Sequence, residues 1–146
     1  MDTKFSSAIH TLILISGANP PMNSDQIATS VGTNGSYIRK LTARLKKSGI
    51  IEGHKGISGF ELKKPPAAIS LLDIYKSVMD VNYIHIFDIH QNPNDRCIVG
   101  ANIEPVLSGM FHELETQLQL KLSKTTLADC ITAMQSNIYN KKEKFK

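Results

Sequence analysis

Positive charge is concentrated in one stretch of this 146-residue chain, from residue 36 to residue 64. The stretch holds eight Lys and Arg residues against two Glu, a net charge of +6, although the whole chain carries only +4. The eight cations are Arg39, Lys40, Arg44, Lys46, Lys47, Lys55, Lys63 and Lys64. Ammonium and guanidinium groups at this density bind the phosphates of a polyanion, and they do so without making or breaking bonds. The sequence therefore predicts non-covalent binding of nucleic acid.

The elements that must position these cations read as a helix-turn-helix. Residues 4–16, 25–30 and 36–48 have apolar side chains at helical spacing, and Ser24 is a favourable N-cap for the second of these helices. Gly32 permits a sharp turn before the third helix. An apolar stripe along the third helix leaves its cations on the other faces, which is typical of a recognition helix. The stripe consists of Ile38, Leu41 and Leu45.

A basic β-hairpin follows the third helix. Residues 50–54 and 60–63 predict two strands, and Gly56 and Gly59 between them permit the positive φ angles of a tight loop. Taken alone, the cations of the third helix are as typical of an ordinary solvent-exposed helix face as of a DNA-binding one. A helix-turn-helix with a basic hairpin directly after it is far more specific, because such a wing reaches the groove beside the helix. The combination predicts DNA binding.

The predicted DNA contacts fall into three groups. Side chains at the N-terminus of a recognition helix read base edges, those further along the helix hold phosphates, and those on the wing touch the minor groove or the backbone. The corresponding residues are Ser36, Tyr37, Arg39 and Lys40 for base edges, Arg44 and Lys47 for phosphates, and His54, Lys55 and Ser58 on the wing.

Three strings occur in order in this part of the chain: Ser36-Tyr37-x-x-x-Leu41-x-x-x-Leu45-x-x-Ser48-Gly49-Ile50-Ile51, Gly56-x-x-Gly59-Phe60-x-Leu62 and Pro65-Pro66-x-x-Ile69-Ser70-Leu71-x-Asp73-Ile74. The series resembles the Rrf2 family of bacterial winged-helix transcription regulators, and the resemblance extends from Lys4 to about Cys130. It implies a homodimer, with one recognition helix per subunit in the major groove, one wing in the adjacent minor groove and a long C-terminal dimerisation helix. Position 39 is often acidic in the family but is Arg39 here, so the family's base preference does not carry over.

The rest of the chain predicts further helices. Helical spacing resumes over 71–79, 100–122 and 127–138, and residues 81–90, within a linker over 81–99, read as an extended segment or a short strand. Pro105 is placed in the first turn of the longest helix, where proline is tolerated. The predicted fold is therefore mostly α with a small β-hairpin wing.

Four regions follow from these patterns: a winged helix-turn-helix domain over 1–80, the linker, a helical dimerisation region over 100–140 and a disordered basic tail over 141–146. The apolar stripe on the longest helix extends for five turns. A stripe of this length beside a small DNA-binding domain is more typical of a subunit interface than of a monomer core. The predicted dimer residues are Ile103, Val106, Leu107, Met110, Phe111, Leu114 and Leu118.

The cysteine pattern predicts no cofactor. In cluster-binding members of the resembled family, three cysteines before the long helix hold an iron–sulphur cluster. Here only Cys97 lies in that loop, and Ile103 and Gly109 stand where further ligands would be sought. The spacing of His85, His90 and Cys97 matches no metal-binding motif, so we expect no metal site.

Two interpretations of Cys97 stay open. It lies beside Arg96 and just before a predicted helix N-terminus, where a lowered pKa would make it a thiol sensor. The alternative is a half-buried, inert cysteine. Cys130 reads as a core residue of the last helix.

Composition and motifs exclude other classes of protein. The content of 41% hydrophobic and 21% charged residues is ordinary for a folded soluble protein. No apolar run approaches the ~20 residues of a membrane helix, and the first residues lack a signal-peptide pattern, so we expect a cytoplasmic protein. No phosphate loop, zinc-protease motif or nucleophile elbow predicts an enzyme. The sequence thus predicts a homodimeric, sequence-specific DNA-binding regulator acting as a repressor; a thiol-sensing regulator and a winged-helix protein-interaction module are the alternatives.

Overall fold

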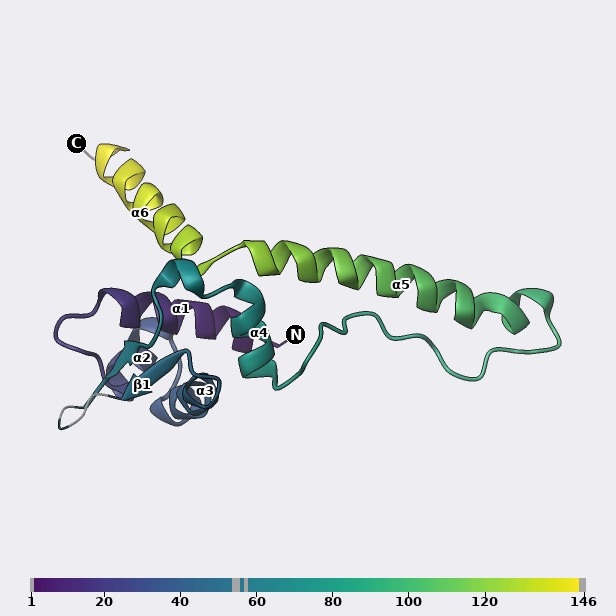
Figure 1. The fold of residues 1–146 in the computed structure, drawn as a ribbon, viewed down its shortest axis with the longest axis horizontal. Helices are drawn as coiled ribbons and strands as arrows, with labels where there is room; N and C mark the ends of the chain where they lie inside the picture. The colour runs from purple at the N-terminus through teal and green to yellow at the C-terminus, as the bar shows by residue number, and fades with distance from the viewer. Residues whose placement is uncertain (1, 54–55, 57, 145–146) are drawn as a thin grey trace.

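The structure is a computed structural model that describes residues 2–53, 56 and 58–144. Figure 1 shows a head built from the first helices and a hairpin, a long helix projecting from the head as an arm, and a last helix leaving from the junction. The elements are α1 (Lys4–Gly17), α2 (Ser24–Val31), α3 (Gly35–Lys47), β1 (Ile51–Gly53), β2 (Phe60–Leu62), the 3₁₀ helix η1 (Pro66–Ala68), α4 (Leu71–Met79), α5 (Ile98–Lys124) and α6 (Leu127–Lys144).

The helix-turn-helix formed by α2 and α3 agrees with the prediction, but each helix begins one residue earlier. Asn23, not Ser24, is the N-cap of α2, because its side chain accepts from the Gln26 N–H while the Gln26 side chain accepts from the Asn23 N–H, both at 2.9 Å. Asn34 caps α3 by a single bond, in which its side chain accepts from the Tyr37 N–H at 2.9 Å. Gly32 between the helices has a φ of 86°, which requires glycine's freedom.

The hydrophobic core lies in the head. The predicted stripe of α3 is confirmed as buried: Ile38, Leu41 and Leu45 are at most 2% exposed. Apolar side chains of α1, α2 and α4 pack against it, and burial on this scale is the main stabilising term for the head. The further core members are Ala8, Leu12, Ile15, Ile27, Ala28, Ile50, Ile51, Ile69, Ile74, Val78 and Leu127.

The predicted hairpin forms, with strands of three residues that are shorter than expected. β1 and β2 pair antiparallel, with Gly53 opposite Phe60. The base of the loop lies against the α1–α2 connection, because a Cβ on Gly59 would come within 2.5 Å of Pro21. Gly59 also has a φ of 146°. A side chain at this position would therefore push the wing away from the head.

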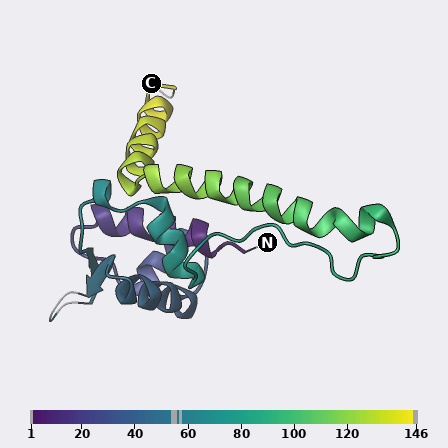
Figure 2. The same ribbon diagram turned by 45° about the vertical axis from the view of Figure 1, so that its right-hand side comes forward.

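The arm is formed by α5, which has 27 residues and a length of about 40 Å. Residues 81–97, here called the strap, run out along α5 and turn back into its N-terminus (Figures 1 and 2). The strap contains no strand in the structure. Pro105 is not in the first turn as predicted; it is the eighth residue of α5, and a helix beginning at the predicted residue 100 would already have placed it sixth. There it removes one backbone hydrogen bond from the helix.

The arm joins the head at the turn between α5 and α6. Backbone N–H groups of Leu71 and Leu127 donate to the carbonyls of Thr125 and Ile69, both at 2.8 Å, and Leu127 is fully buried in the head's core. α6 continues to Lys144, so the part of the tail over 141–144 that was predicted to be disordered is helical. Lys and Glu are good helix formers, and cations are favourable at a helix C-terminus. None of the helices in the described part of the chain is long and apolar enough to cross a membrane.

Candidate nucleic-acid interface

α3 presents a polar, cationic face to solvent. Of the predicted base-reading residues, Ser36, Arg39 and Lys40 are exposed, whereas Tyr37 is half-buried and packs against the core. Lys47, predicted to hold a phosphate, is exposed at the last residue of the helix. The exposed polar side chains therefore extend from the N-terminus of α3 to its C-terminus.

Arg39 has a partner that the sequence reading did not assign. Its guanidinium Nη1 lies 3.7 Å from Oδ1 of Asp25 in the first turn of α2. Gly35 makes room for this pair, because a Cβ there would lie 2.1 Å from Asp25 Oδ1 and 3.0 Å from Arg39 Nη1. Asp25 thus lies beside the Arg39 guanidinium in a solvent-exposed ion pair. The acidic first turn of α2 was the sequence signal, but only the packing of α2 on α3 connects the two residues.

Arg44 is turned away from the exposed face of α3. It is half-buried, and its Nη1 donates to the carbonyl of Val78 on α4. Ser48 and Ser77 add hydroxyl hydrogen bonds to the Arg44 carbonyl, both at 3.0 Å. This arrangement favours a role for Arg44 in fixing α3 on α4 over the predicted phosphate contact.

The wing is attached to α3 through a cation–π contact. The ammonium of Lys46 lies 5.1 Å from the centre of the Phe60 ring on β2. On the strands, Glu52 and Glu61 stand opposite each other and are exposed, so the strands are acidic. Ser58 is exposed near the loop. His54 and Lys55, the other predicted wing contacts, lie outside the residues that the structure describes.

The predicted dimer stripe divides into two rows. Ile103, Leu107 and Phe111 are half-buried, and the Phe111 ring lies 5.1 Å from the Phe87 ring of the strap. The other four side chains are spaced four residues apart and point to solvent, with exposed fractions of 38–58%. This exposed row consists of Val106, Met110, Leu114 and Leu118.

Glu115 fastens the strap to α5. Its carboxylate accepts from the backbone N–H groups of Ile86 and Phe87, the latter at 3.2 Å, and these donors lower the Glu115 pKa. His85 Nε2 donates to Oδ1 of Asp88 at 2.8 Å, and its Nδ1 lies 3.7 Å from Oε2 of Glu115. The hydrogen bond to Asp88 raises the pKa of His85, with Glu115 adding to the effect. No spacing rule predicts the contacts to Glu115, because they join residues about 30 apart.

Cys97 is the N-cap residue of α5 and is exposed, which removes the half-buried interpretation. The N–H groups of Gly100 and Val99 lower the pKa of its thiol. Cys130 on α6 is half-buried, and burial raises its pKa. The two thiols flank α5 at opposite ends and therefore cannot pair within one chain.

A capped short helix, a glycine turn, a second helix with a cationic face and a hairpin packed beside it define a winged helix-turn-helix protein. Residues 1–133 match the model of the Rrf2 family, described as an iron-dependent transcriptional regulator. The chain therefore belongs to the Rrf2 family, as the sequence strings predicted.

Relatives and solved structures agree with this assignment. YwnA of Bacillus subtilis, which is named as an HTH-type transcriptional regulator, is 36% identical over 129 residues, 88% of this chain and 95% of YwnA. A crystal structure of a protein described as DNA-binding has 34% identity and a TM-score of 0.71, covering 88% of this chain and 98% of that one. A Lactobacillus plantarum structure described as a transcriptional regulator covers both chains fully, with a TM-score of 0.76 and 22% identity. The last similarity shows that the arm and α6 belong to the shared fold.

The iron dependence in the family's description does not fit the donors of this chain. An iron–sulphur cluster is held mainly by several thiolates that converge on it. Here one thiol lies at the start of α5, and Ile103 offers no ligand atom on the following turns. Across residues 2–53, 56 and 58–144, no three His, Cys, Asp or Glu side chains are grouped to hold a metal ion. The described donor set therefore does not build a cluster site.

Proposed function

We propose that this chain is a homodimeric transcriptional repressor that binds a palindromic DNA operator in the cytoplasm, by binding alone and without catalysis. The observation that carries the proposal is the exposed polar face of α3, which has Arg39 and Lys40 in its N-terminal half and Lys46 and Lys47 at its C-terminus. The N-terminal end, with Ser36, Arg39 and Lys40, would read base edges in the major groove. Lys47 would hold a phosphate, and Ser58 with its unplaced neighbours His54 and Lys55 would contact the minor groove or the backbone.

The arm supports the dimeric part of the proposal. α5 has no buried residue within the single chain. The exposed row places four apolar side chains on one side of the helix, and such a row is stable in water when it packs against its equivalent in a second subunit. Two copies joined along α5 would present two α3 helices, which matches the two-fold symmetry of a palindromic site.

The salt dependence of binding tests the proposal. An operator is first selected from a random duplex library, and its affinity is then measured by fluorescence anisotropy over a range of salt concentrations. With Lys47 and Lys55 as the phosphate-contacting cations of each subunit, log affinity of the dimer should fall against log salt with a slope of roughly −4. A slope near zero, or a library that yields no preferred sequence, would overturn the proposal and favour a protein-interaction module.

Matched variants locate the contacts. Lys47→Gln removes one proposed phosphate contact per subunit, so the slope of the dimer should become shallower by about 2. Lys121→Gln removes an equally exposed cation from α5 and should leave the slope unchanged. Equal effects of the two variants would show general charge attraction without a defined interface.

The exposed thiol at the N-terminus of α5 favours a second candidate, redox control through Cys97. A thiolate with a lowered pKa reacts with a peroxide to give a sulfenic acid and water or an alcohol. Footprinting in wild type and Cys97→Ser, with and without hydrogen peroxide, tests this. We expect the peroxide to change the wild-type footprint only; an unchanged footprint in all four conditions contradicts the sensor.

A further inference from the structure

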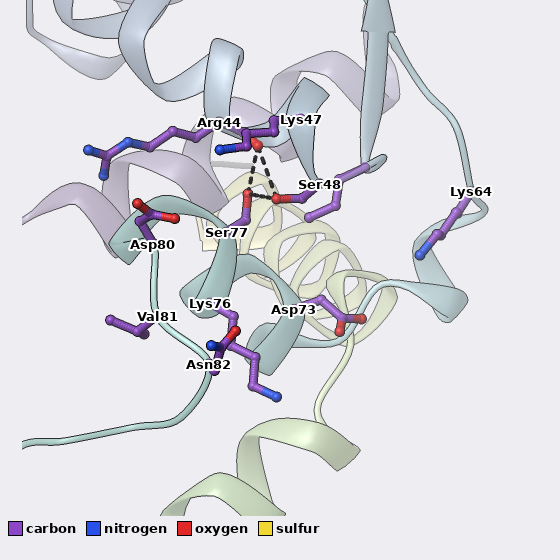
Figure 3. Close-up of a pocket in the computed structure, with 11 residues that line it drawn as sticks. Arg44, Lys47, Ser48, Lys64, Asp73, Lys76, Ser77, Asp80, Val81 and Asn82 are labelled. Carbon is purple, nitrogen blue, oxygen red and sulfur yellow. Dashed lines mark hydrogen bonds between the residues drawn. The ribbon is translucent and has the colours of Figure 1, made fainter.

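A cavity of about 520 Å³ opens between α3, α4 and the first residues of the strap. Figure 3 shows Arg44, Lys47 and Ser48 from the end of α3 on one side, and on another Asp80, which follows α4, with Val81 and Asn82 from the start of the strap. Lys64 comes from the chain that follows the wing, and Asp73, Lys76 and Ser77 come from α4. The volume is within the range of small-molecule sites. Lys47 is the one proposed DNA contact that lines the cavity; the base-reading residues of α3, Ser36, Arg39 and Lys40, do not line it.

The lining of this cavity is positively charged. Four cations face two carboxylates, which leaves a net charge of +2. One carboxylate is already engaged, because Asp73 accepts from the Ser70 N–H at 3.2 Å in the cap of α4. Lys47, Lys64 and Lys76 form no ion pair or hydrogen bond with the described residues. Three ammonium groups around the cavity are therefore available to form ion pairs with a bound anion.

The polar groups at the floor of the cavity already have hydrogen-bond partners within the protein. Ser48 and Ser77 lie 2.7 Å apart and both bond to the Arg44 carbonyl, so their hydroxyl hydrogens are engaged within the protein (Figure 3). Ile50, which is 1% exposed, adds an apolar surface. A neutral floor below unpaired cations suits a small anion with an uncharged body better than it suits a metal ion or a neutral polar ligand.

We propose that this cavity is a binding site for a small phosphate-bearing molecule of the phosphomonoester class. Such a group carries about −1.5 to −2 charges at neutral pH, which balances the net charge of the lining. Lysine ammoniums hold phosphates as point charges, and three of the four cations are lysines. The bound molecule would touch the end of the recognition helix and the start of the strap at the same time. It would thereby connect the position of α3 to the position of the arm.

Binding itself does not depend on the DNA-binding function proposed above; only a consequence for operator affinity does. The first measurement is therefore made without DNA. Inorganic phosphate is titrated into the full chain at constant ionic strength, with chloride as the reference anion, and amide chemical shifts are followed by NMR. We expect saturable shifts confined to the amides of Ser48, Ser77, Val81 and Asn82. Linear shifts, shifts equal to those in chloride, or shifts centred on residues 36–40 would overturn the proposal.

A variant pair fixes the assignment. Lys64→Gln/Lys76→Gln removes two exposed or half-buried ammoniums that have no partner, neither of which is a proposed DNA contact, and reduces the net lining charge from +2 to 0. The dissociation constant for phosphate should rise by roughly tenfold or more. Lys121→Gln/Lys124→Gln, with both changes on the exposed end of α5, should leave it unchanged. Equal weakening by the two variants would show general charge attraction and would overturn the site.

A second readout separates this site from the DNA interface. In phosphate-free buffer, the salt slope of operator binding should be the same for Lys64→Gln/Lys76→Gln and for wild type. A slope that becomes shallower by 3 or more would mean that these lysines hold DNA phosphates, since about 0.9 is lost per contact and a dimer loses four. That result would overturn the separate ligand site while supporting DNA binding. Absence of any DNA binding would overturn the proposed function but leave the phosphate titration standing.

Discussion

The head and the arm of this molecule differ in how much of their apolar surface is buried within the single chain. The head places apolar side chains from α1, α2, α3 and α4 in one core, most of them fully buried. The arm is a 27-residue helix with no buried residue, covered along part of its length only by the strap. The head therefore buries its own core, whereas the exposed row of the arm, Val106, Met110, Leu114 and Leu118, has no packing partner among the residues that the structure describes.

This difference separates two kinds of constraint on the sequence. In the head, a side chain is fixed by volume, because a closely packed core responds to the loss of a few methylene groups. On the exposed row, the choice of side chain is constrained by its packing against a second subunit. A substitution on the exposed row can then leave the single subunit stable and yet abolish the dimer. A substitution in the core lowers the stability of the subunit itself.

The largest expected effect comes from placing charge on the exposed row. Met110→Glu/Leu114→Glu would put four carboxylates into the proposed dimer, at a cost of more than about 5 kcal/mol per dimer. Sedimentation equilibrium should then give the single-chain mass of 16.1 kDa instead of twice that value. Circular dichroism should show that the head stays folded.

A matched control keeps this test specific. Ser108→Glu/Thr116→Glu adds the same charge to exposed positions of α5 outside the row, and the dimer should persist. A dimer that survives Met110→Glu/Leu114→Glu would show that the row is not the subunit interface and would weaken the contrast between head and arm.

The next effect compares one chemical change in the two regions. Leu41→Ala deletes a side chain that is 2% exposed in the head, and it should lower the free energy of unfolding by about 2–5 kcal/mol. Leu120→Ala makes the same change at a side chain of α5 that is 48% exposed and outside the exposed row, with an expected change within about 0.5 kcal/mol. Urea denaturation measures both. Similar losses for the two variants would contradict the division into a packed head and a thinly covered arm.

Sequence reasoning succeeded where local chemistry decides the structure. The stripe of Ile38, Leu41 and Leu45 indicated which side of α3 is buried, and the two wing glycines indicated a hairpin. Helix spacing also revealed that α5 is the longest element. These features depend on residues within a few positions of one another, so a single sequence contains them.

The remainder depends on contacts between distant segments. Periodicity gave the dimer stripe as one surface, but the strap covers Phe111 and leaves Met110 exposed. In the sequence, Arg44 is indistinguishable from the exposed cations of α3. In the structure its guanidinium points inward, because it donates to the carbonyl of Val78, 34 residues away. The cap of α2 is a different case, because its signal was local: Gln26 follows Asn23 by three residues, the spacing of a reciprocal cap, whereas Ile27 follows Ser24.

A smaller effect concerns the reading end of the head, which should act independently of the arm. Arg39→Ala should cost about 1–3 kcal/mol of operator binding and relax one base position if Arg39 reads a base edge. Competition binding against operators altered one pair at a time measures this. A uniform loss over all sequences would reassign Arg39 to a phosphate contact.

Two neighbours of Arg39 sharpen the same test. Gly35→Ala forces Asp25 and Arg39 apart without changing any charge, because the added Cβ would lie 2.1 Å from Asp25 Oδ1. Asp25→Asn removes the charge and keeps the size. Loss of base discrimination in both variants would show that Asp25 positions Arg39; a gain in affinity for all sequences in Asp25→Asn alone would show only charge repulsion of DNA.

In the arm, the strap should detach when its main acceptor is removed. Glu115→Ala deletes the carboxylate that receives the N–H groups of Ile86 and Phe87. Each such bond contributes about 1 kcal/mol, so hydrogen-exchange protection at these two amides should fall roughly tenfold. Protection in the core of the head, for example at Leu41, should be unaffected because the strap opens as a separate unit.

The smallest expected effect is a pH dependence of the same strap. The pKa of His85 is raised above its ordinary value of 6.5 because Asp88 and Glu115 favour the protonated ring; His112 is the other titratable group near Glu115. The stabilising contribution of His85 is therefore complete below pH 6.5 and is lost as the pH rises through the raised pKa. Protection at Ile86, taken as the ratio of wild type to His85→Gln, should be higher at about pH 6 than at about pH 8. A ratio that does not change with pH would mean that the strap is held by Glu115 and the Phe87–Phe111 contact alone, with no contribution from the charge of His85.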